Sequence, residues 1–169
     1  LISDNSLKRL INNFKNKVGR MILFKSLKPH GYGRAILEKN KVVKVVEEIH
    51  TSKSEKLIEL CNSGIMLVNK VIFFKLIQQI KFRKIKKERF LTDIFEIYFK
   101  KKIPFSFIQA EEEEMSGINT LLDFNKVDKI LQKRLVTKFL NNGVLIKKPE
   151  TCYFSYDTKI QSKVIIEPN

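Results

Sequence analysis

Several hydrogen-bonding side chains lie where an apolar run of the sequence begins or ends. Glu47 and Glu48 follow the run that starts at Val42, and Asn62 shortly precedes the run that starts at Gly64. Ligands of open α/β sheets bind at the carboxyl ends of strands, where a carboxylate can accept hydrogen bonds. An Asn amide offers both donors and an acceptor. A binding site for a polar ligand is one interpretation; a solvated strand end and a turn are the alternatives.

Three further residues have chemistry that a ligand site could use. Gly33, in "GYGR" at Gly31–Arg34, lets the backbone approach a ligand closely, whereas the alternative is an ordinary turn glycine. The amide oxygen of Asn119 is an acceptable ligand for Mg²⁺, although capping of the next helix is also open. Thr92 is equally a candidate helix cap.

Other residues that could do chemistry lack the necessary spacing. His30 and His50 have no second His, Cys or carboxylate at useful spacing, so we expect both in exposed loops. Glu111–Glu114 reads as a charged loop rather than a metal cluster. Cys61 and Cys152 form no metal-ligand pattern with either His, which favours free thiols in a reducing compartment such as the cytoplasm.

The 169-residue chain is strongly basic, with a net charge of +15 from 33 Lys and Arg against 18 Asp and Glu. A nucleic-acid-binding module is one interpretation, and the run Lys81–Arg89 is its best support. Most of these residues are Lys, however, whereas readers of nucleic acid commonly use the bidentate Arg side chain. A solvated surface is therefore the favoured interpretation. The apolar runs end at a Lys within a few residues, so no membrane span or signal peptide is expected.

The elements that must position these residues follow from apolar periodicity. Helices are predicted at Leu7–Phe14, Ser52–Leu60, Lys70–Ile80 and Leu121–Asn142, with a further helix after Thr92. Buried or half-buried strands are predicted at Arg20–Phe24, from Gly64, and from Ile103, together with a hairpin that turns at Asn40. Strands that alternate with helices predict a three-layer α/β fold.

The pattern changes after Gly143, which suits a helix stop. Residues 144–169 show short apolar pairs between polar residues, without a helical period. This pattern resembles the first rung of a β-solenoid, and one rung cannot bury its own apolar face.

Seven segments, in order, resemble one family of enzymes. They are "LISDNSLKRL", "GYGR", "KVVKVVEE", "CNSGIM", "ERFLTDIF", "SGINT" and "KVIIEPN". The family is that of the bifunctional N-acetylglucosamine-1-phosphate uridylyltransferase and glucosamine-1-phosphate N-acetyltransferase, the GlmU type. The resemblance implies a partial Rossmann-like nucleotide-diphospho-sugar transferase (GT-A-like) domain. Residues 1–143 would be the C-terminal part of that domain, and residues 144–169 the linker and first rung of a left-handed β-helix.

The resemblance also implies an activity. The family joins UTP to N-acetylglucosamine-1-phosphate with Mg²⁺ and releases pyrophosphate. The product, UDP-N-acetylglucosamine, is a cytoplasmic precursor of peptidoglycan and lipopolysaccharide. The matched positions imply that Gly33, Glu47, Asn62 and Thr92 bind the sugar. Asn119 would bind both Mg²⁺ and the nucleotide sugar.

The sequence departs from the family in ways that bear on activity. Ser63, Arg89 and Phe90 replace a Thr and two Tyr of the family motifs. The 169 residues contain neither the Gly-rich loop (Ala-Gly-x-Gly-Thr-x-Met) that holds the triphosphate nor the Mg²⁺-binding Asp. We therefore expect the sugar-binding half of a uridylyltransferase, inactive alone, that needs an N-terminal half as partner. On its own we expect it to be unstable or to self-associate. An inactive remnant of a split or decayed gene is the alternative.

Overall fold

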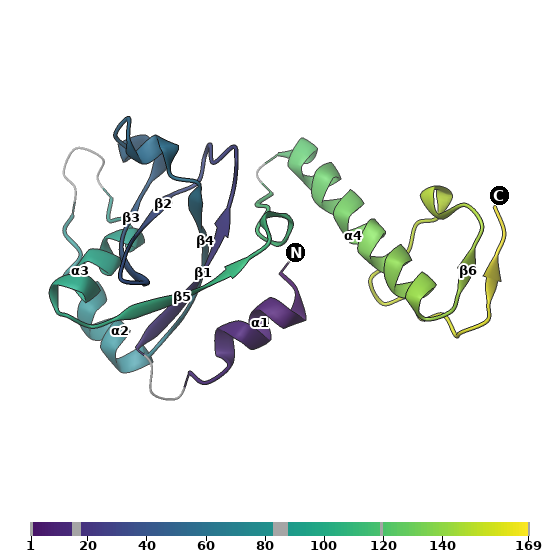
Figure 1. Ribbon diagram of the computed structural model, residues 1–169, viewed down its shortest axis with the longest axis horizontal. Helices are drawn as coiled ribbons and strands as arrows, with labels where there is room; N and C mark the ends of the chain where they lie inside the picture. Colours follow the sequence, from purple (N-terminus) through teal and green to yellow (C-terminus); the bar gives the residue numbers. More distant parts are fainter. Residues whose placement is uncertain (1, 15–17, 83–87, 119, 169) are drawn as a thin grey trace. The chain divides into compact units, whose positions relative to one another are not determined.

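The computed structural model describes residues 2–14, 18–82, 88–118 and 120–168 (Figure 1). Contacts within the chain divide it into two units, an N-terminal unit at Ile2–Met115 and a C-terminal unit from Ser116 onward. Each unit has its own apolar core.

A five-stranded mixed sheet forms the centre of the N-terminal unit. Its strand order is β3-β2-β4-β1-β5, where β1 pairs antiparallel with β4 and parallel with β5. The strands are β1 (Gly19–Lys25), β2 (Arg34–Glu38), β3 (Lys41–Val46), β4 (Leu60–Val68) and β5 (Phe105–Ala110). Six of the seven residues of β1 are buried, as expected for the strand between two others.

Helices cover both faces of this sheet. On one face α1 (Asp4–Ile11) contributes Leu10 to a core with Ile22 and Phe24 of β1. On the other face α2 (Lys70–Ile77) and α3 (Ile94–Lys100) pack on the alternate residues of β1, Met21 and Leu23. Successive side chains of a strand point to opposite faces, so an unbroken apolar β1 serves both cores. The predicted three-layer α/β fold is confirmed.

Turn chemistry fixes the β2–β3 hairpin. Lys39 and Asn40 at its tip have φ angles of 47° and 58°, the left-handed pair that a two-residue hairpin turn requires. Glu38 then pairs with Lys41, and Arg34 pairs with Val46 at the other end. The predicted turn at Asn40 is confirmed, and the hairpin brings the residue before β2 beside the residue after β3.

A bulge in β4 re-aims the residues that precede it. The pairing of β1 with β4 shifts between Met21 and Leu23, and Gly64 lies opposite this shift with a φ of 79°. Glycine adopts this backbone conformation without strain. The strand consequently starts at Leu60, four residues before the predicted start, and Asn62 lies within it.

The edge of β4 that faces β2 is mostly open within the described residues. The two strands meet through the pair Arg34–Cys61 and through the backbone bond from Asn62 N to the Gly33 carbonyl, 2.8 Å. Beyond Asn62, no strand of the sheet pairs with this edge in the part of the chain described. An unpaired strand edge offers hydrogen-bonding groups to a further strand.

The C-terminal unit consists of one long helix and two very short strands. α4 (Leu121–Asn141) begins with a capping box between Thr120 and Asp123, and it ends before Gly143, as predicted. Its buried Leu135 and Phe139 pack against Val144, Ile146 and Phe154. The strands β6 (Leu145–Ile146) and β7 (Ile165–Ile166) pair in parallel. A family-type domain boundary at residue 143 stays a prediction, as does the β-helix.

The prediction of a helix at Ser52–Leu60 is wrong. This segment holds a single 3₁₀ turn at Glu55–Leu57, and Leu57 is 82% exposed. Without a buried apolar face, one short run of helix-compatible residues gains too little packing to propagate a helix.

Among the described residues, no helix is both long and apolar enough to cross a membrane.

Candidate ligand site at the end of the hairpin

A hydrogen bond between distant residues defines the site. Thr92 Oγ1 donates to Glu47 Oε1 over 2.8 Å, although 45 residues separate them. Thr92 is 9% exposed and lies in a 3₁₀ turn, Leu91–Asp93, whose N-cap is Phe90, while Asp93 precedes α3. Thr92 therefore caps neither helix, and its hydroxyl instead orients the carboxylate of Glu47.

Gly33 lies against the second oxygen of the same carboxylate. A Cβ built on Gly33 would come 3.1 Å from Val45 Cγ1 and 3.5 Å from Glu47 Oε2. A larger residue would therefore crowd Val45 of β3. Gly33 is buried, and its missing side chain lets the end of β3 and the Glu47 carboxylate lie close to its backbone. The predicted approach of this backbone to a ligand stays a prediction.

Asn62 joins this group through the backbone. Its N–H donates to the Gly33 carbonyl over 2.8 Å, and its Oδ1 accepts a 2.9 Å bond from Gly64 N in the bulge. The side chain is thus held by its acceptor end. No partner is recorded for its amide nitrogen among the described residues, so the donor end can serve a ligand.

An ion pair between Arg34 and Glu48 lies next to Glu47 in the chain. Arg34 is 2% exposed, and its Nη2 lies 2.7 Å from Glu48 Oε2, while its Nη1 donates to the Tyr32 carbonyl. Glu47 and Glu48 follow β3 directly, and successive side chains of an extended chain point to opposite sides. Glu48 therefore pairs with Arg34, whereas the Glu47 carboxylate points to the other side, where a ligand could bind it. Arg34 therefore has a structural role in this part of the sheet.

A small cavity opens beside Glu47 and Thr92. It has a volume of about 110 Å³, and His50, Asp93 and Glu96 also line it. His50 packs edge-on against Phe90, with ring centroids 5.3 Å apart. His30 and His50 are exposed, as predicted. Sequence patterns gave no reason to place His50 at the site, because its proximity depends on the 3₁₀ turn at Glu48–His50.

Four of the five predicted site residues thus form one continuous group: Gly33, Glu47, Asn62 and Thr92. The fifth, Asn119, lies outside the described residues. No cluster of three His, Cys, Asp or Glu residues that could hold a metal occurs in the described ranges.

Two carboxylates of the predicted charged loop accept hydrogen bonds from serines. Ser26 Oγ donates to Glu112 over 2.6 Å, and Ser3 N and Oγ donate to Glu114. These bonds connect the loop to the end of β1 and to the start of α1.

Both cysteines are free thiols, as predicted. Cys61 is fully buried next to the site, and burial raises the pKa of its thiol to about 11, against the opposing effect of Arg34. A thiol that stays protonated near neutral pH is a poor nucleophile. Cys61 is therefore a packing residue.

The sequence is similar to that of bacterial proteins named bifunctional protein GlmU. It is 37% identical over 141 residues to that of Bartonella bacilliformis, covering 83% of this chain and 31% of the relative. It is 33% identical over 169 residues to that of Bradyrhizobium diazoefficiens, covering 99% and 38%. The chain therefore spans about a third of the length of these relatives. No family model matches it.

Two solved structures share the fold. A Bacillus anthracis protein assigned as a glucose-1-phosphate thymidylyltransferase, in complex with sucrose, matches 68% of this chain and 44% of its own, with a TM-score of 0.50 and 19% identity. A nucleoside-diphosphate-sugar pyrophosphorylase from Vibrio cholerae matches 75% and 49%, with a TM-score of 0.52 and 13% identity. The predicted fold class, part of a Rossmann-like nucleotidyltransferase domain, is confirmed.

The similarity to GlmU proteins thus covers most of this chain and about a third of each relative.

Proposed function

We propose that this chain forms the sugar-binding half of a uridylyltransferase that makes UDP-N-acetylglucosamine from UTP and N-acetylglucosamine-1-phosphate. One observation carries the proposal. Gly33, Glu47, Asn62 and Thr92 belong to four separate motifs spread over 60 residues, yet direct contacts connect them in space. Strand pairing brings Gly33, Glu47 and Asn62 together, and the side-chain bond from Thr92 to Glu47 adds a residue that no strand pairing requires. Such convergence is expected of a ligand site.

The geometry suggests a role for each residue. Thr92 holds one oxygen of Glu47, so the other oxygen can accept hydrogen bonds from sugar hydroxyl groups. Gly33 lets the Glu47 carboxylate lie close to the backbone at the end of the hairpin. The Asn62 amide nitrogen is suited to donate to an N-acetyl carbonyl oxygen.

The reaction needs little covalent chemistry from the protein. An oxygen of the sugar phosphate attacks the α-phosphorus of UTP, the bond from that phosphorus to the bridging oxygen breaks, and pyrophosphate leaves with the bond's electron pair. Alignment of the two substrates is the main contribution expected from this chain. Mg²⁺ supplies charge neutralisation in our proposal, with Asn119 as one ligand.

The triphosphate-binding half is proposed as a separate segment. The open edge of β4 beyond Asn62 is a suitable place for its strands, since those groups have no strand partner in the described part of the sheet. We place the enzyme in the cytoplasm, where both cysteines stay reduced.

Binding of N-acetylglucosamine-1-phosphate to the full chain tests the sugar site without requiring catalysis. Saturation-transfer NMR should detect contact of the protein with the N-acetyl methyl group. Glu47→Gln should weaken binding about tenfold, because a charged acceptor is lost. The matched control is Glu59→Gln, the same change at an exposed position. Equal affinity of both variants, or no contact at the N-acetyl group, would reject the assignment of this site.

A further inference from the structure

A second, larger concavity lies at the opposite end of the β2–β3 hairpin. Gly33 and Glu47 flank the open end of the hairpin, whereas this groove borders its tip. It has a volume of about 680 Å³, within the range of ligand pockets. Its floor is apolar and comes from β3, the end of α3 and the lead-in to β5: Val42, Phe99, Ile103, Pro104 and Phe105.

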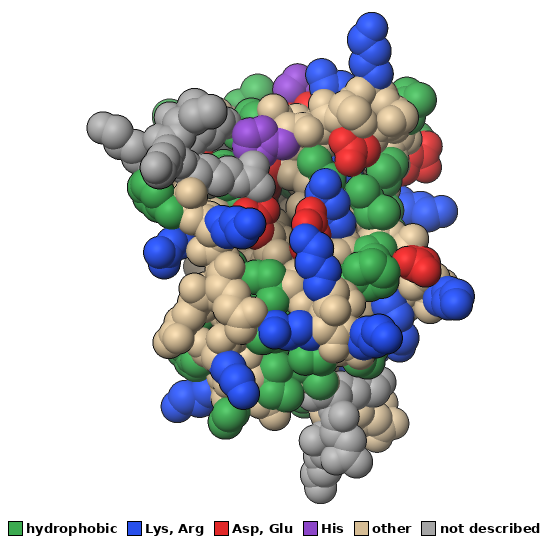
Figure 2. Space-filling view, turned by 90° about the vertical axis from the view of Figure 1, so that its left-hand side faces the viewer, with side chains coloured by type: hydrophobic (Ala, Val, Ile, Leu, Met, Phe, Trp, Pro, Cys, Tyr) green, Lys and Arg blue, Asp and Glu red, His purple; other side chains and the backbone are tan. Residues whose placement is uncertain are grey.

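Lysines form both banks of this groove. Lys39 and Lys41 come from the hairpin tip, Lys100 is the last residue of α3, and Lys102 lies in the turn before β5. Lys100 pairs with Glu96 over 3.4 Å, but no ion pair of the other three is recorded in the described part of the chain. Glu38 is the one acidic residue of the lining. Figure 2, which views the molecule from the left-hand side of Figure 1, shows basic side chains around apolar ones.

The backbone under two of these lysines is unusual. Lys39 and Lys102 have φ angles of 47° and 57°, a left-handed conformation that Gly or Asn adopts more readily than Lys. The chain uses Asn at the adjoining left-handed position, Asn40. Lys163, which does not line the groove, has a φ of 67° as well, so this conformation alone does not mark a ligand site. It does identify two groove positions at which Asn can replace Lys without backbone strain.

We propose that this groove binds an extended acidic peptide segment of a partner protein, with an apolar side chain between acidic residues. The apolar floor would receive the central side chain, and the lysines of the two banks would face carboxylates on either side. Lys presents a mobile point charge on a flexible stem, which can reach carboxylates at several positions along a peptide. The net charge of +15 favours acidic partners as well.

The sheet supports an extended conformation of the bound segment. β3 is the terminal strand of the order β3-β2-β4-β1-β5, so one of its edges has no strand partner in the described residues. Lys41 and Val42, at the start of this edge strand, line the groove. A peptide that adds to such an edge gains main-chain hydrogen bonds, while alternate side chains enter the groove.

The experiment uses the full chain and a fluorescein-labelled peptide in which Leu has two Glu or Asp residues on each side. The test variant is the double substitution Lys39→Asn and Lys102→Asn. Asn suits both left-handed positions, so the variant should unfold at the same or higher urea concentration than the original chain. Fluorescence anisotropy should show affinity weakened about fivefold to tenfold by the loss of two charges.

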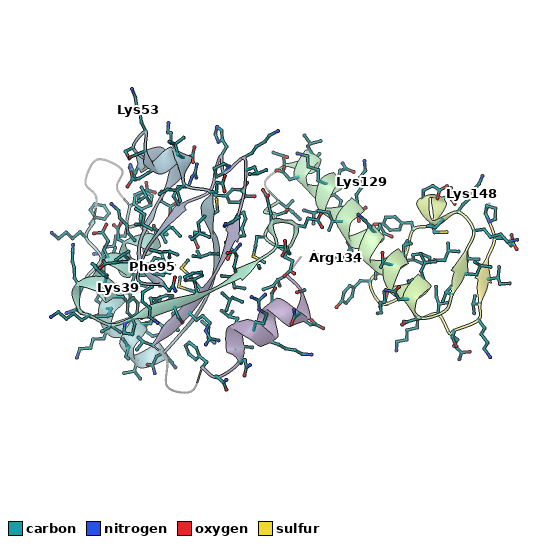
Figure 3. The ribbon with its side chains drawn as sticks, in the orientation of Figure 1. Lys39, Lys53, Phe95, Lys129, Arg134 and Lys148 are labelled. Carbon is teal, nitrogen blue, oxygen red and sulfur yellow. The ribbon has the colours of Figure 1, made fainter. Side chains whose placement is uncertain are left out.

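Two controls separate the groove from general charge. Lys53→Asn with Lys56→Asn removes the same charge from exposed positions, and Lys53 lies well away from Lys39 (Figure 3). The second control is a peptide with Ser in place of Leu. The proposal predicts that the control protein binds the Leu peptide as tightly as the original chain does. It also predicts that the original chain binds the Ser peptide several-fold more weakly. Equal loss in both double variants, equal affinity of the Ser peptide, or equal binding of an oligonucleotide of the same charge would overturn it.

Discussion

At the residue scale, the site depends on how Thr92 fixes Glu47. Thr92→Val removes the 2.8 Å bond while it keeps the shape of the side chain. We expect affinity for N-acetylglucosamine-1-phosphate to fall about fivefold to tenfold, because the carboxylate is no longer oriented. Thr92→Ser retains the hydroxyl and should restore most of the affinity. Titration by NMR compares the two variants, and a Ser variant as weak as the Val variant would argue against the hydrogen bond.

Arg20 is the second residue with a specific expected effect. Its buried Nη1 donates to the carbonyls of Arg9, Leu10 and Asn12 over 2.7–2.9 Å, and so satisfies the C-terminal end of α1. Arg20→Met should lower the free energy of unfolding by about 2–4 kcal/mol, since these acceptors lose a charged donor. Urea unfolding measures this loss. A loss below about 0.5 kcal/mol, the range of ordinary surface substitutions, would contradict the role.

The two cysteines should differ sharply in reactivity. Cys61 is buried with a thiol pKa of about 11, whereas Cys152 is partly exposed. Since the raised pKa keeps Cys61 protonated well above neutral pH, a thiol reagent at pH 8 should modify Cys152 alone in the folded chain. Both should react in urea. Mass spectrometry counts the modified sites, and equal rates in the folded chain would indicate that the sheet is open near Cys61.

At the element scale, two glycines of the sheet distinguish packing from backbone strain. A Cβ on Gly19 would lie 2.0 Å from the Phe105 ring across the β1–β5 pair, so Gly19→Ala should destabilise by about 3 kcal/mol. Gly64→Ala meets no atom within 4 Å, and only its φ of 79° costs about 1 kcal/mol. Chemical denaturation gives both values. The reverse order would contradict the register of β1 with β5.

The sequence predicted elements whose signals are local. The hairpin turn at Asn40 and the end of α4 before Gly143 depend on residues a few positions apart. The start of β4 was missed because the bulge at Gly64 interrupts the alternation that reveals a strand. Motif resemblance selected Glu47 and Thr92, but their direct bond spans 45 residues and required the three-dimensional fold.

At the scale of the whole molecule, the chain should self-associate at high concentration. The edge of β4 is largely open among the described residues, and α4 begins with exposed Leu121, Leu122 and Phe124. Exposed apolar surface and strand edges both favour association. Sedimentation velocity over a wide concentration range should show species larger than 19.9 kDa. A monomer at all concentrations, with cooperative thermal unfolding, would mean that these surfaces need no partner.

The most direct test of the central claim is complementation by the other half. The chain is mixed with a purified segment of Bartonella bacilliformis GlmU that precedes the region similar to this chain, and pyrophosphate release from UTP and N-acetylglucosamine-1-phosphate is measured with Mg²⁺. Release that requires both polypeptides, and that falls at least about tenfold with Glu47→Gln but not with Glu59→Gln, is the predicted result. No release from a mixture that forms a stable complex would contradict the account.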